Sequence, residues 1–373
     1  MSGFVEPAYG RRGLGDVVPA VGRALGTDVL PPPSALELPA APAYVVFLVD
    51  GLGSRLLQKY AHAAPYLSSL LDGVEPGTAG VPSTTATSLT SLGTGLTPGT
   101  HGVVGFTSRV PGTEKLLNAL FWDKSVDPLE WQPHPTAFSR LAHAGVRVDV
   151  VNKREFDRSG LTVAAHRGAG YIGADRIGER IAGAVAGSAH RPSLTYLYDG
   201  DLDWTGHRYG VDSAQWLQQL AAIDAETVQL RESLPDEVRL VVVADHGMVD
   251  ATDPASRLDV DDHDELRDGL VLLGGEARFR HLYCAEGAAS AVAGAWSELL
   301  GNRAVVLLRE DAIERGWFGP VTESVLPRLG DVVVAARGDV GMFSRRDFGY
   351  EMSLIGLHGS LTPDEMLIPI LVG

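Results

Sequence analysis

The clearest pattern in the chain is a series of short apolar runs separated by longer mixed segments. The first run, Tyr44–Val49, is apolar at every position and ends at Asp50 and Gly51. A strand without a polar face is typical of a parallel sheet covered by helices on both sides. Further short segments rich in β-forming residues are Val146–Val151, Leu194–Tyr198, Arg239–Ala244 and Leu367–Val372.

Helical patterns lie between most of these runs, for example over Thr136–Ala144 and Ser213–Ser233. Strands that alternate with helices predict an α/β fold with a doubly wound, mostly parallel sheet. Residues 31–42, PPPSALELPAAP, are too rich in proline for a helix. We therefore expect residues 1–43 to form an extended N-terminal lead-in.

The pattern changes between about residue 255 and residue 350. Short strand-like and helix-like segments follow one another there, namely Ala277–Cys284, Ala289–Leu300, Ala304–Arg315 and Asp331–Ala336. This order indicates a small α+β insert, which we expect to form a cap over the site. The predicted catalytic α/β core then comprises residues 44–254 and 351–373, with the cap at 255–350.

Charge and composition restrict the kinds of molecule that the protein is expected to bind. Acidic residues outnumber basic ones by 47 to 31, which gives a formal net charge of −16. Such a surface repels a nucleic-acid duplex or an anionic membrane, although a local cation site would still bind a small anion. The same excess also keeps a protein in solution, which is its ordinary explanation.

The expected location is the cytoplasm. The first residues lack a basic start followed by an apolar stretch, and no apolar run approaches the ~20 residues of a membrane span. The one cysteine, Cys284, allows no internal disulfide and excludes zinc sites built from several cysteines. Oligomeric state is not predicted by any of these patterns.

Acidic residues follow three of the predicted strands. Asp50 closes the first run, Asp245 and His246 follow Arg239–Ala244, and Asp203 lies a few residues beyond Leu194–Tyr198. Sites in open α/β sheets form just beyond the carboxyl ends of the strands. We therefore expect these side chains to meet at one edge of the sheet.

Each candidate ligand also has an ordinary explanation when it is taken alone. Asp203 and His207 are four residues apart and can bind one metal from a helical turn, or form a surface hydrogen-bonded pair. His358, just before the last strand, is a third imidazole or a hydrogen-bonded loop residue. Together, six ligands without sulfur fit two zinc ions, with manganese as an alternative: Asp50, Asp203, His207, Asp245, His246 and His358.

A segment rich in threonine and serine supplies a candidate nucleophile. A helix is predicted from Thr84 or Thr85 to Leu92, closed by Gly93 and Gly95. A hydroxyl at a helix N-terminus faces free backbone N–H groups and the positive end of the helix dipole, which suits attack on phosphorus. The alternative is that the threonine only caps the helix.

The ordered set of motifs resembles the type I phosphodiesterase/nucleotide pyrophosphatase family of the alkaline phosphatase superfamily. The matching pieces span residues 44–359 and are Asp50-Gly51, Pro82-x-x-Thr85 to His101-Gly102, Asp203-x-x-x-His207-x-x-Gly210, Asp245-His246-Gly247-Met248 and His358-Gly359. The resemblance implies an alkaline phosphatase-like fold. It also implies one zinc on Asp50, Asp245, His246 and the Thr85 oxygen, and a second on Asp203, His207 and His358. Thr85 would take the phosphoryl group covalently before water removes it.

Two positions depart from the family pattern. Ala86 stands where nucleotide-cleaving members usually have an aromatic residue, and Ser88 stands where an asparagine commonly helps to hold phosphate. A preference for nucleotides is therefore not implied. Ser88 is kept as a candidate substrate contact, and Phe106, Trp122 and Trp204 are candidate pocket residues, although large aromatic residues more often belong to a core.

The predicted substrate is a small anionic phosphoester. The residues flanking Thr85 include no Arg or Lys, which favours a phosphodiester or pyrophosphate over a monoester dianion. A phosphonate hydrolase, phosphomutase or monoesterase with the same metal core is an alternative. A metal-dependent binding protein without catalysis is an alternative of another class.

Overall fold

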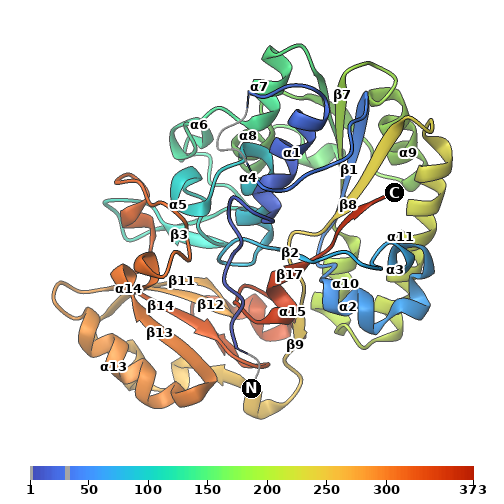
Figure 1. Cartoon of the computed structure of the whole chain (residues 1–373). Coiled ribbons are helices and arrows are strands. Elements are labelled where there is room, and N and C mark those ends of the chain that lie inside the picture. Colours follow the sequence, from blue (N-terminus) through green and yellow to red (C-terminus); the bar gives the residue numbers. More distant parts are fainter. Residues whose placement is uncertain (1–2, 30–33) are drawn as a thin grey trace.

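The protein is built around a six-stranded sheet in a computed structural model that describes residues 3–29 and 34–373. The strand order is β18-β8-β1-β7-β5-β6, and β18 is antiparallel to β8 while the other neighbours are parallel (Figure 1). The predicted doubly wound, mostly parallel α/β sheet is confirmed. The strands are β1 (Ala43–Val49), β5 (Arg147–Asn152), β6 (Gly170–Gly173), β7 (Ser193–Asp199), β8 (Val238–Val243) and β18 (Ile370–Val372).

Helices cover both faces of this sheet, which explains why every residue of β1 is buried. Two long helices lie on one face, and four others lie on the opposite face (Figure 1). The first pair is α9 (Ile177–Gly187) and α11 (Ala214–Ser233), and the others are α1 (Val17–Ala24), α4 (Thr85–Thr94), α7 (Ala137–His143) and α8 (Gly160–His166). Shorter helices of the chain are α2 (Ser54–Lys59), α3 (Pro65–Ser69), α5 (Pro98–His101), α6 (Pro128–Trp131), α10 (Asp201–Tyr209), α12 (Asp264–Arg267), α14 (Arg309–Glu314) and α15 (Pro363–Met366).

The helices predicted over 136–144 and 213–233 begin at hydroxyl caps. Thr136 accepts a hydrogen bond from the N–H of Ser139, and Ser213 accepts one from the N–H of Trp216. Each cap satisfies a backbone donor that the first helical turn leaves without a partner. The predicted starts therefore lie at the observed N-caps.

Helix α4 carries the candidate nucleophile and is buried at all ten positions. It begins at Thr85, after the extended N-cap residue Thr84, and its C-cap is Gly95 in a left-handed conformation with φ 70°. Gly93 lies inside the helix and not after its end, so the helix extends to Thr94, beyond the predicted Leu92. Glycine at 95 stops the helix because other residues adopt a positive φ at a cost.

The N-terminal segment is not wholly extended, which corrects the prediction for residues 1–43. Helix α1 forms there, and its residues Val17, Val18 and Val21 are buried in the main apolar core. Burial of this apolar face outweighs the weak helix propensity of valine. Pro19 lies in the first turn, where its missing N–H breaks no helical hydrogen bond. Residues 31–33 of the proline-rich stretch lie outside the described residues.

A second, four-stranded antiparallel sheet lies in the predicted insert, with the order β11-β12-β14-β13 (Figure 1). Strand β11 was not predicted. The members are β11 (Leu270–Glu276), β12 (Phe279–Cys284), β13 (Ala304–Leu308) and β14 (Val332–Ala336), with helix α13 (Ala289–Leu300). Phe279 and Val333 share the apolar core of the main sheet, whereas Leu282 and Val334 pack with Trp296 in a second core. The division into core and cap stays a prediction.

The predicted closing strand Leu367–Val372 is divided in two. β17 (Leu367–Ile368) pairs with β2 (Gly77–Thr78), and β18 joins the main sheet. Smaller paired strands are β3 (Thr107–Arg109) with β4 (Leu116–Asn118), β9 (Val249–Asp250) with β16 (Gly356–Leu357), and β10 (Arg257–Asp259) with β15 (Gly341–Phe343). Among the helices in residues 3–29 and 34–373, none combines the length and apolar character that crossing a bilayer requires.

Candidate metal centre

Two neighbouring strands bring the first group of candidate ligands together. Asp50 follows β1, and Asp245 and His246 follow β8, which pairs with β1. His246 Nε2 lies 3.4 Å from Asp50 Oδ1 and 3.4 Å from Asp245 Oδ2. We call Asp50, Asp245 and His246 the first cluster. All three are buried, because the strand register places them directly over the end of the sheet.

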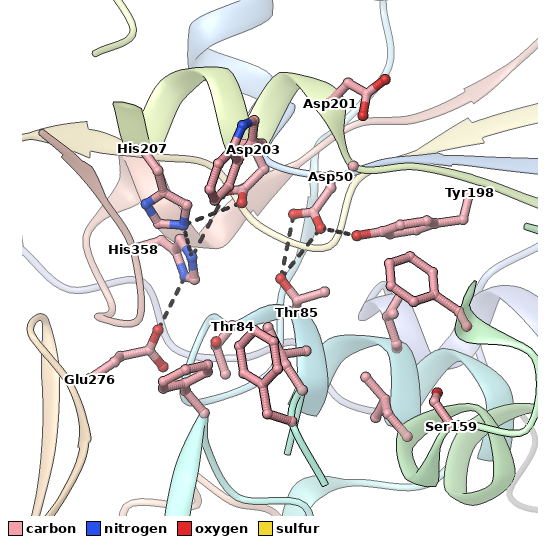
Figure 2. Close-up of a pocket in the computed structure, with 18 of the residues that line it drawn as sticks. Asp50, Thr84, Thr85, Ser159, Tyr198, Asp201, Asp203, His207, Glu276 and His358 are labelled. Atoms are coloured by element: carbon pink, nitrogen blue, oxygen red, sulfur yellow. Dashed lines mark hydrogen bonds and ion pairs between the residues drawn. The ribbon is translucent and has the colours of Figure 1, made fainter. Parts of the chain in front are cut away.

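The second cluster consists of Asp203, His207 and His358. Asp203 and His207 lie one turn apart on α10, and His358 follows β16 (Figure 2). His207 Nε2 is 3.2 Å from Asp203 Oδ2 and 3.2 Å from His358 Nε2. The ligand atoms in each cluster lie within 4.8 Å of one another. The predicted grouping of six ligands into two sets is therefore present in the fold.

The three histidines present the same nitrogen to the clusters. In each ring, Nδ1 lies near a backbone carbonyl oxygen, which can only accept a hydrogen bond, so Nδ1 carries a hydrogen and Nε2 is the nitrogen that a metal would bind. This orientation is typical of metal-ligating histidine. The pairs are His207 with Gly356 (2.7 Å), His246 with Gly247 (3.0 Å) and His358 with Ser83 (3.0 Å).

The donor set fits bound cations. The Nε2 atoms of His207 and His358 lie 3.2 Å apart. Among the described residues, the buried oxygens Asp203 Oδ1 and Asp245 Oδ2 have no hydrogen-bond partner. Asp245 Oδ1, in contrast, accepts from the backbone N–H groups of Gly51 and His246. Converging carboxylate oxygens and imidazole nitrogens are stabilised by metal ions, and each cluster supplies three such side chains.

Electrostatics leads to the same conclusion. Burial, with the nearby charges of Asp245 and Asp203, raises the pKa of Asp50 well above its usual value. Burial, with the neighbouring His246, lowers the pKa of His358 well below its usual value. Burial opposes protonation of His207 as well, but the Asp203 carboxylate outweighs it and raises the pKa of His207 to about 9. Cations would reverse the repulsion between the carboxylates of the two clusters.

Thr85 lies beside the first cluster. Its Oγ1 is 3.4 Å from Asp50 Oδ2 and 3.5 Å from Asp50 Oδ1 (Figure 2). The same oxygen is 3.3 Å from His246 Nε2. The hydroxyl of Tyr198 donates to Asp50 Oδ2 at 2.5 Å and fixes that carboxylate. Thr85 is also the first residue of α4, where the backbone N–H groups of the first helical turn have no partner within the helix. The structure therefore places the predicted nucleophile next to the predicted ligands.

A cavity of about 890 Å³ is lined by Thr85, by Asp50 of the first cluster and by all three residues of the second cluster. Phe106 and Trp204 line it, as the sequence predicted, and Trp204 is 65% exposed. Sequence reasoning missed several further lining residues: Tyr198, Phe121, Phe156, Tyr350 and Glu276. Aromatic residues are common throughout a chain, and only their convergence in the fold distinguishes these.

Two predicted substrate contacts do not line this cavity. Ser88 is buried, and its hydroxyl donates to the backbone carbonyl of Asp245 at 2.9 Å. Trp122 donates from Nε1 to the carbonyl of Val126 and packs edge-on against Trp131. The helical phase of α4 turns Ser88 toward β8, away from the cavity. We therefore correct both assignments: Ser88 supports the first cluster, and Trp122 belongs to local packing.

Comparison with known proteins identifies the family. The family described as type I phosphodiesterase / nucleotide pyrophosphatase matches residues 44–360. The chain is similar to ectonucleotide pyrophosphatase/phosphodiesterase family member 7 of Mus musculus, with 37% identity over 71 residues, which are 18% of this chain and 16% of that relative. For the Homo sapiens protein the identity is 40% over 60 residues, 15% of this chain and 13% of the relative. The aligned part is thus a small fraction of either relative.

Solved structures share the fold. Human ectonucleotide pyrophosphatase/phosphodiesterase 5 superposes with a TM-score of 0.68 at 18% identity and covers 88% of this chain and 87% of its own. Phosphonoacetate hydrolase from Sinorhizobium meliloti 1021, in complex with phosphonoformate, has a TM-score of 0.67 at 19% identity and covers 91% of both chains. The match across residues 44–360, which contains both clusters and Thr85, shows that the chain belongs to the type I phosphodiesterase/nucleotide pyrophosphatase family.

Proposed function

We propose that the protein is a two-zinc phosphohydrolase that cleaves phosphodiester or pyrophosphate bonds through a covalent phosphothreonine at Thr85. The observation that carries this proposal is the position of the Thr85 hydroxyl, 3.3 Å from His246 Nε2 and 3.4 Å from Asp50 Oδ2. A nucleophile within reach of several metal-ligand atoms, at a helix N-terminus, is suited to phosphoryl transfer.

The clusters would hold one ion each. Asp50, Asp245 and His246, with the Thr85 oxygen, would hold the first, and the second cluster would hold the other. Mixed nitrogen and oxygen ligands without sulfur suit catalytic zinc, and manganese accepts the same ligands. When bound, such ions stabilise the deprotonated form of a hydroxyl and the oxygens around phosphorus.

The chain's own residues account for the order of events. The Thr85 oxygen attacks phosphorus, the bond from phosphorus to the leaving oxygen breaks, and the leaving group departs with a proton. The N–H groups at the start of α4 face the oxygens of the transferred phosphoryl group. Water then attacks the same phosphorus, the bond to the threonine oxygen breaks, and the Thr85 hydroxyl is restored.

The charges around the cavity favour a substrate with one negative charge on the reacting phosphate. Lys153 is the cationic side chain among the described lining residues, and its Nζ already pairs with Asp201 Oδ1 at 2.9 Å. No arginine in the described part of the chain lines the cavity to hold a dianion in a bidentate fork. We therefore propose a diester or pyrophosphate, with no preference for a nucleotide, because Ala86 offers no ring for stacking.

We also propose that the protein acts in the cytoplasm. The single cysteine, Cys284, fits a reducing compartment. The net charge of −16 disfavours binding to anionic membranes and nucleic-acid duplexes. Fractionation of cells that express the natural gene tests this location.

Replacement of Thr85 tests the covalent step. Thr85→Ala should retain two zinc ions per chain but lose turnover of bis(p-nitrophenyl) phosphate by about 10³-fold or more, as expected when a nucleophile is removed. Mass spectrometry of wild-type protein acid-quenched during turnover of this substrate should show one added p-nitrophenylphosphoryl group on Thr85, because only one p-nitrophenol leaves in the first step. The matched control is Thr94→Ala, whose hydroxyl lies on the same helix and donates to the carbonyl of Thr90. Unchanged turnover in Thr85→Ala would overturn the mechanism.

A panel of three substrates tests the reaction class. We expect faster turnover of bis(p-nitrophenyl) phosphate than of p-nitrophenyl phosphate, and no turnover of phosphonoacetate. Turnover of phosphonoacetate alone would show a phosphonate hydrolase, and preference for the monoester would show a monoesterase or phosphomutase. A chain that binds zinc but turns over none of these would support the non-catalytic alternative.

A further inference from the structure

A buried carboxylate outside both clusters lies against one of the proposed ligands. Glu276 is the last residue of β11, and it is 8% exposed. Its Oε2 lies 3.4 Å from Nδ1 of His358, the nitrogen that faces away from the second cluster (Figure 2). The same Nδ1 is 3.0 Å from the carbonyl oxygen of Ser83. The four-stranded sheet thus places one charged group beside the metal centre.

Glycines on both sides permit this approach. Gly275 has φ +81°, and a Cβ there would lie 2.1 Å from the carbonyl oxygen of Phe279. Gly359 has φ +124°, and a Cβ there would lie 2.9 Å from Cγ of Glu276. Glycine therefore follows His358 because the side chain of Glu276 occupies the space that any larger residue would need. Gly275 thus allows the close backbone turn next to Glu276, and Gly359 leaves room for the Glu276 side chain beside His358.

The basic residues near Glu276 are bound to other groups. Arg280 binds Glu351 and the carbonyl of Met342. Arg278 donates to Glu365 from Nε and Nη2, and to the carbonyl of Val340 from Nη1. Among the described residues, Glu276 Oε1 has no hydrogen-bond partner. The Glu276 carboxyl group therefore faces the imidazole of His358, and the side chain of Thr84 is its other polar neighbour. A carboxylate on the outer nitrogen of a ligating histidine fixes the ring and increases its basicity as a ligand.

We propose that Glu276 is a positioning residue for the second cluster, which strengthens metal binding by Asp203, His207 and His358 and leaves the first cluster unaffected. This inference rests on the proposed function only in assuming that each cluster binds a metal ion. It implies that the β11–β12 hairpin and the metal centre are coupled, because the hairpin supplies the outer partner of one ligand.

Zinc affinity of the full-length protein tests the proposal. The metal-free chain is titrated with zinc against a chromophoric chelator, and a site-resolved fit gives two dissociation constants. Glu276→Gln keeps the shape and an acceptor oxygen but removes the charge. We expect it to weaken one site by about 10-fold to 100-fold and to leave the other within twofold. Glu276→Ala, which also removes the acceptor, should weaken the same site further, and Glu276→Asp should restore part of the affinity.

The matched control is Glu286→Gln, which removes the same charge from an exposed position just after β12. It should leave both dissociation constants within twofold of the wild-type values. Circular dichroism and the melting temperature of each metal-free variant show whether the fold is retained. If Glu276→Gln does not fold, the same titration is made with Glu276→Ala, which should also weaken zinc binding at one site only.

Two results would overturn the role of Glu276. One is a pair of unchanged dissociation constants in a folded Glu276→Gln or Glu276→Ala protein, and the other is an equal loss at both sites. A wild-type chain that binds fewer than two zinc ions would instead contradict the two-metal proposal. This experiment measures zinc affinity and not turnover. Its result can therefore be interpreted even if a residue other than Thr85 is the nucleophile.

Discussion

The two clusters have the same kinds of ligands but are assembled in different ways. The first is built at the ends of the adjacent strands β1 and β8, and its side chains are 0–4% exposed. The second joins a helix to a loop that comes 151 residues later, and Asp203 and His207 are 12% and 19% exposed. The first is fixed by sheet register, whereas the second depends on tertiary packing. The candidate ligands of one centre can therefore differ in how firmly the fold holds them in position before a metal binds.

The largest expected effect separates the clusters by activity. His246→Ala should reduce turnover of bis(p-nitrophenyl) phosphate by about 10³-fold or more, because it removes a ligand beside the nucleophile and several kcal/mol of stabilisation at phosphorus are lost. His207→Ala should reduce turnover less, and its activity should recover partly with excess zinc. Steady-state kinetics at rising zinc concentration measures both. An equal loss of turnover in the two variants, with no recovery on addition of zinc, would contradict the proposed difference between the clusters.

Stability of the metal-free protein should depend on pH through the second cluster. The pKa of His207 is raised from 6.5 to about 9, so its contribution to stability is fully present below pH 6.5. That contribution is lost as the pH rises from 6.5 through about 9. Urea unfolding of the metal-free chain should therefore show a falling free energy of unfolding across this window. His207→Gln should flatten the fall, and an identical slope in this variant would contradict the assignment.

Metal release should occur in two phases. The partly exposed second cluster is expected to lose zinc to a chelator about tenfold faster than the buried first cluster, because a ligand site that water can reach opens more readily. Stopped-flow detection with a chromophoric chelator measures both rates. Glu276→Gln should accelerate only the faster phase. A single phase that releases both ions would mean that the two sites open together.

The smallest effect is expected at Ser88. Ser88→Ala removes the hydrogen bond to the Asp245 carbonyl and should lower the free energy of unfolding by about 1 kcal/mol. The KM for substrate should not change, because Ser88 lies outside the cavity. Denaturant unfolding and steady-state kinetics give the two values. A large rise in KM without a loss of stability would restore the substrate-binding role that its sequence position suggested.

Much of the fold and the convergence of the six candidate ligands could be predicted because each rests on a local pattern. The apolar run before Asp50 identified a buried strand, and acids at strand ends identified the edge where the site forms. The helix at 17–24 was missed, since its valines favour a strand locally and only burial against the core makes them helical. Glu276 was missed because one acid in a mixed segment gives no signal, and its contact with His358 joins residues 82 positions apart.

The direction in which a side chain points was harder to predict than the helix or strand on which it lies. Ser88 and Thr85 lie on the same helix, three residues apart, yet one faces β8 and the other faces the cavity. Sequence spacing alone did not fix the rotation of α4 relative to the sheet. Trp122 shows the same limit, because its indole N–H binds a carbonyl four residues away and not a substrate.

The close packing of α4 against α8 limits which substitutions this protein can accept. A Cβ at Gly93 would lie 1.9 Å from the carbonyl oxygen of Ala165 in α8, so the helix that presents Thr85 has no room to slide or rotate. Phe121, by comparison, is 81% exposed at the cavity wall and tolerates replacement. We therefore expect changes in substrate range to come from substitutions of exposed cavity residues such as Phe121. Random mutagenesis should recover inactivating substitutions at Gly93, two helical turns from the Thr85 hydroxyl.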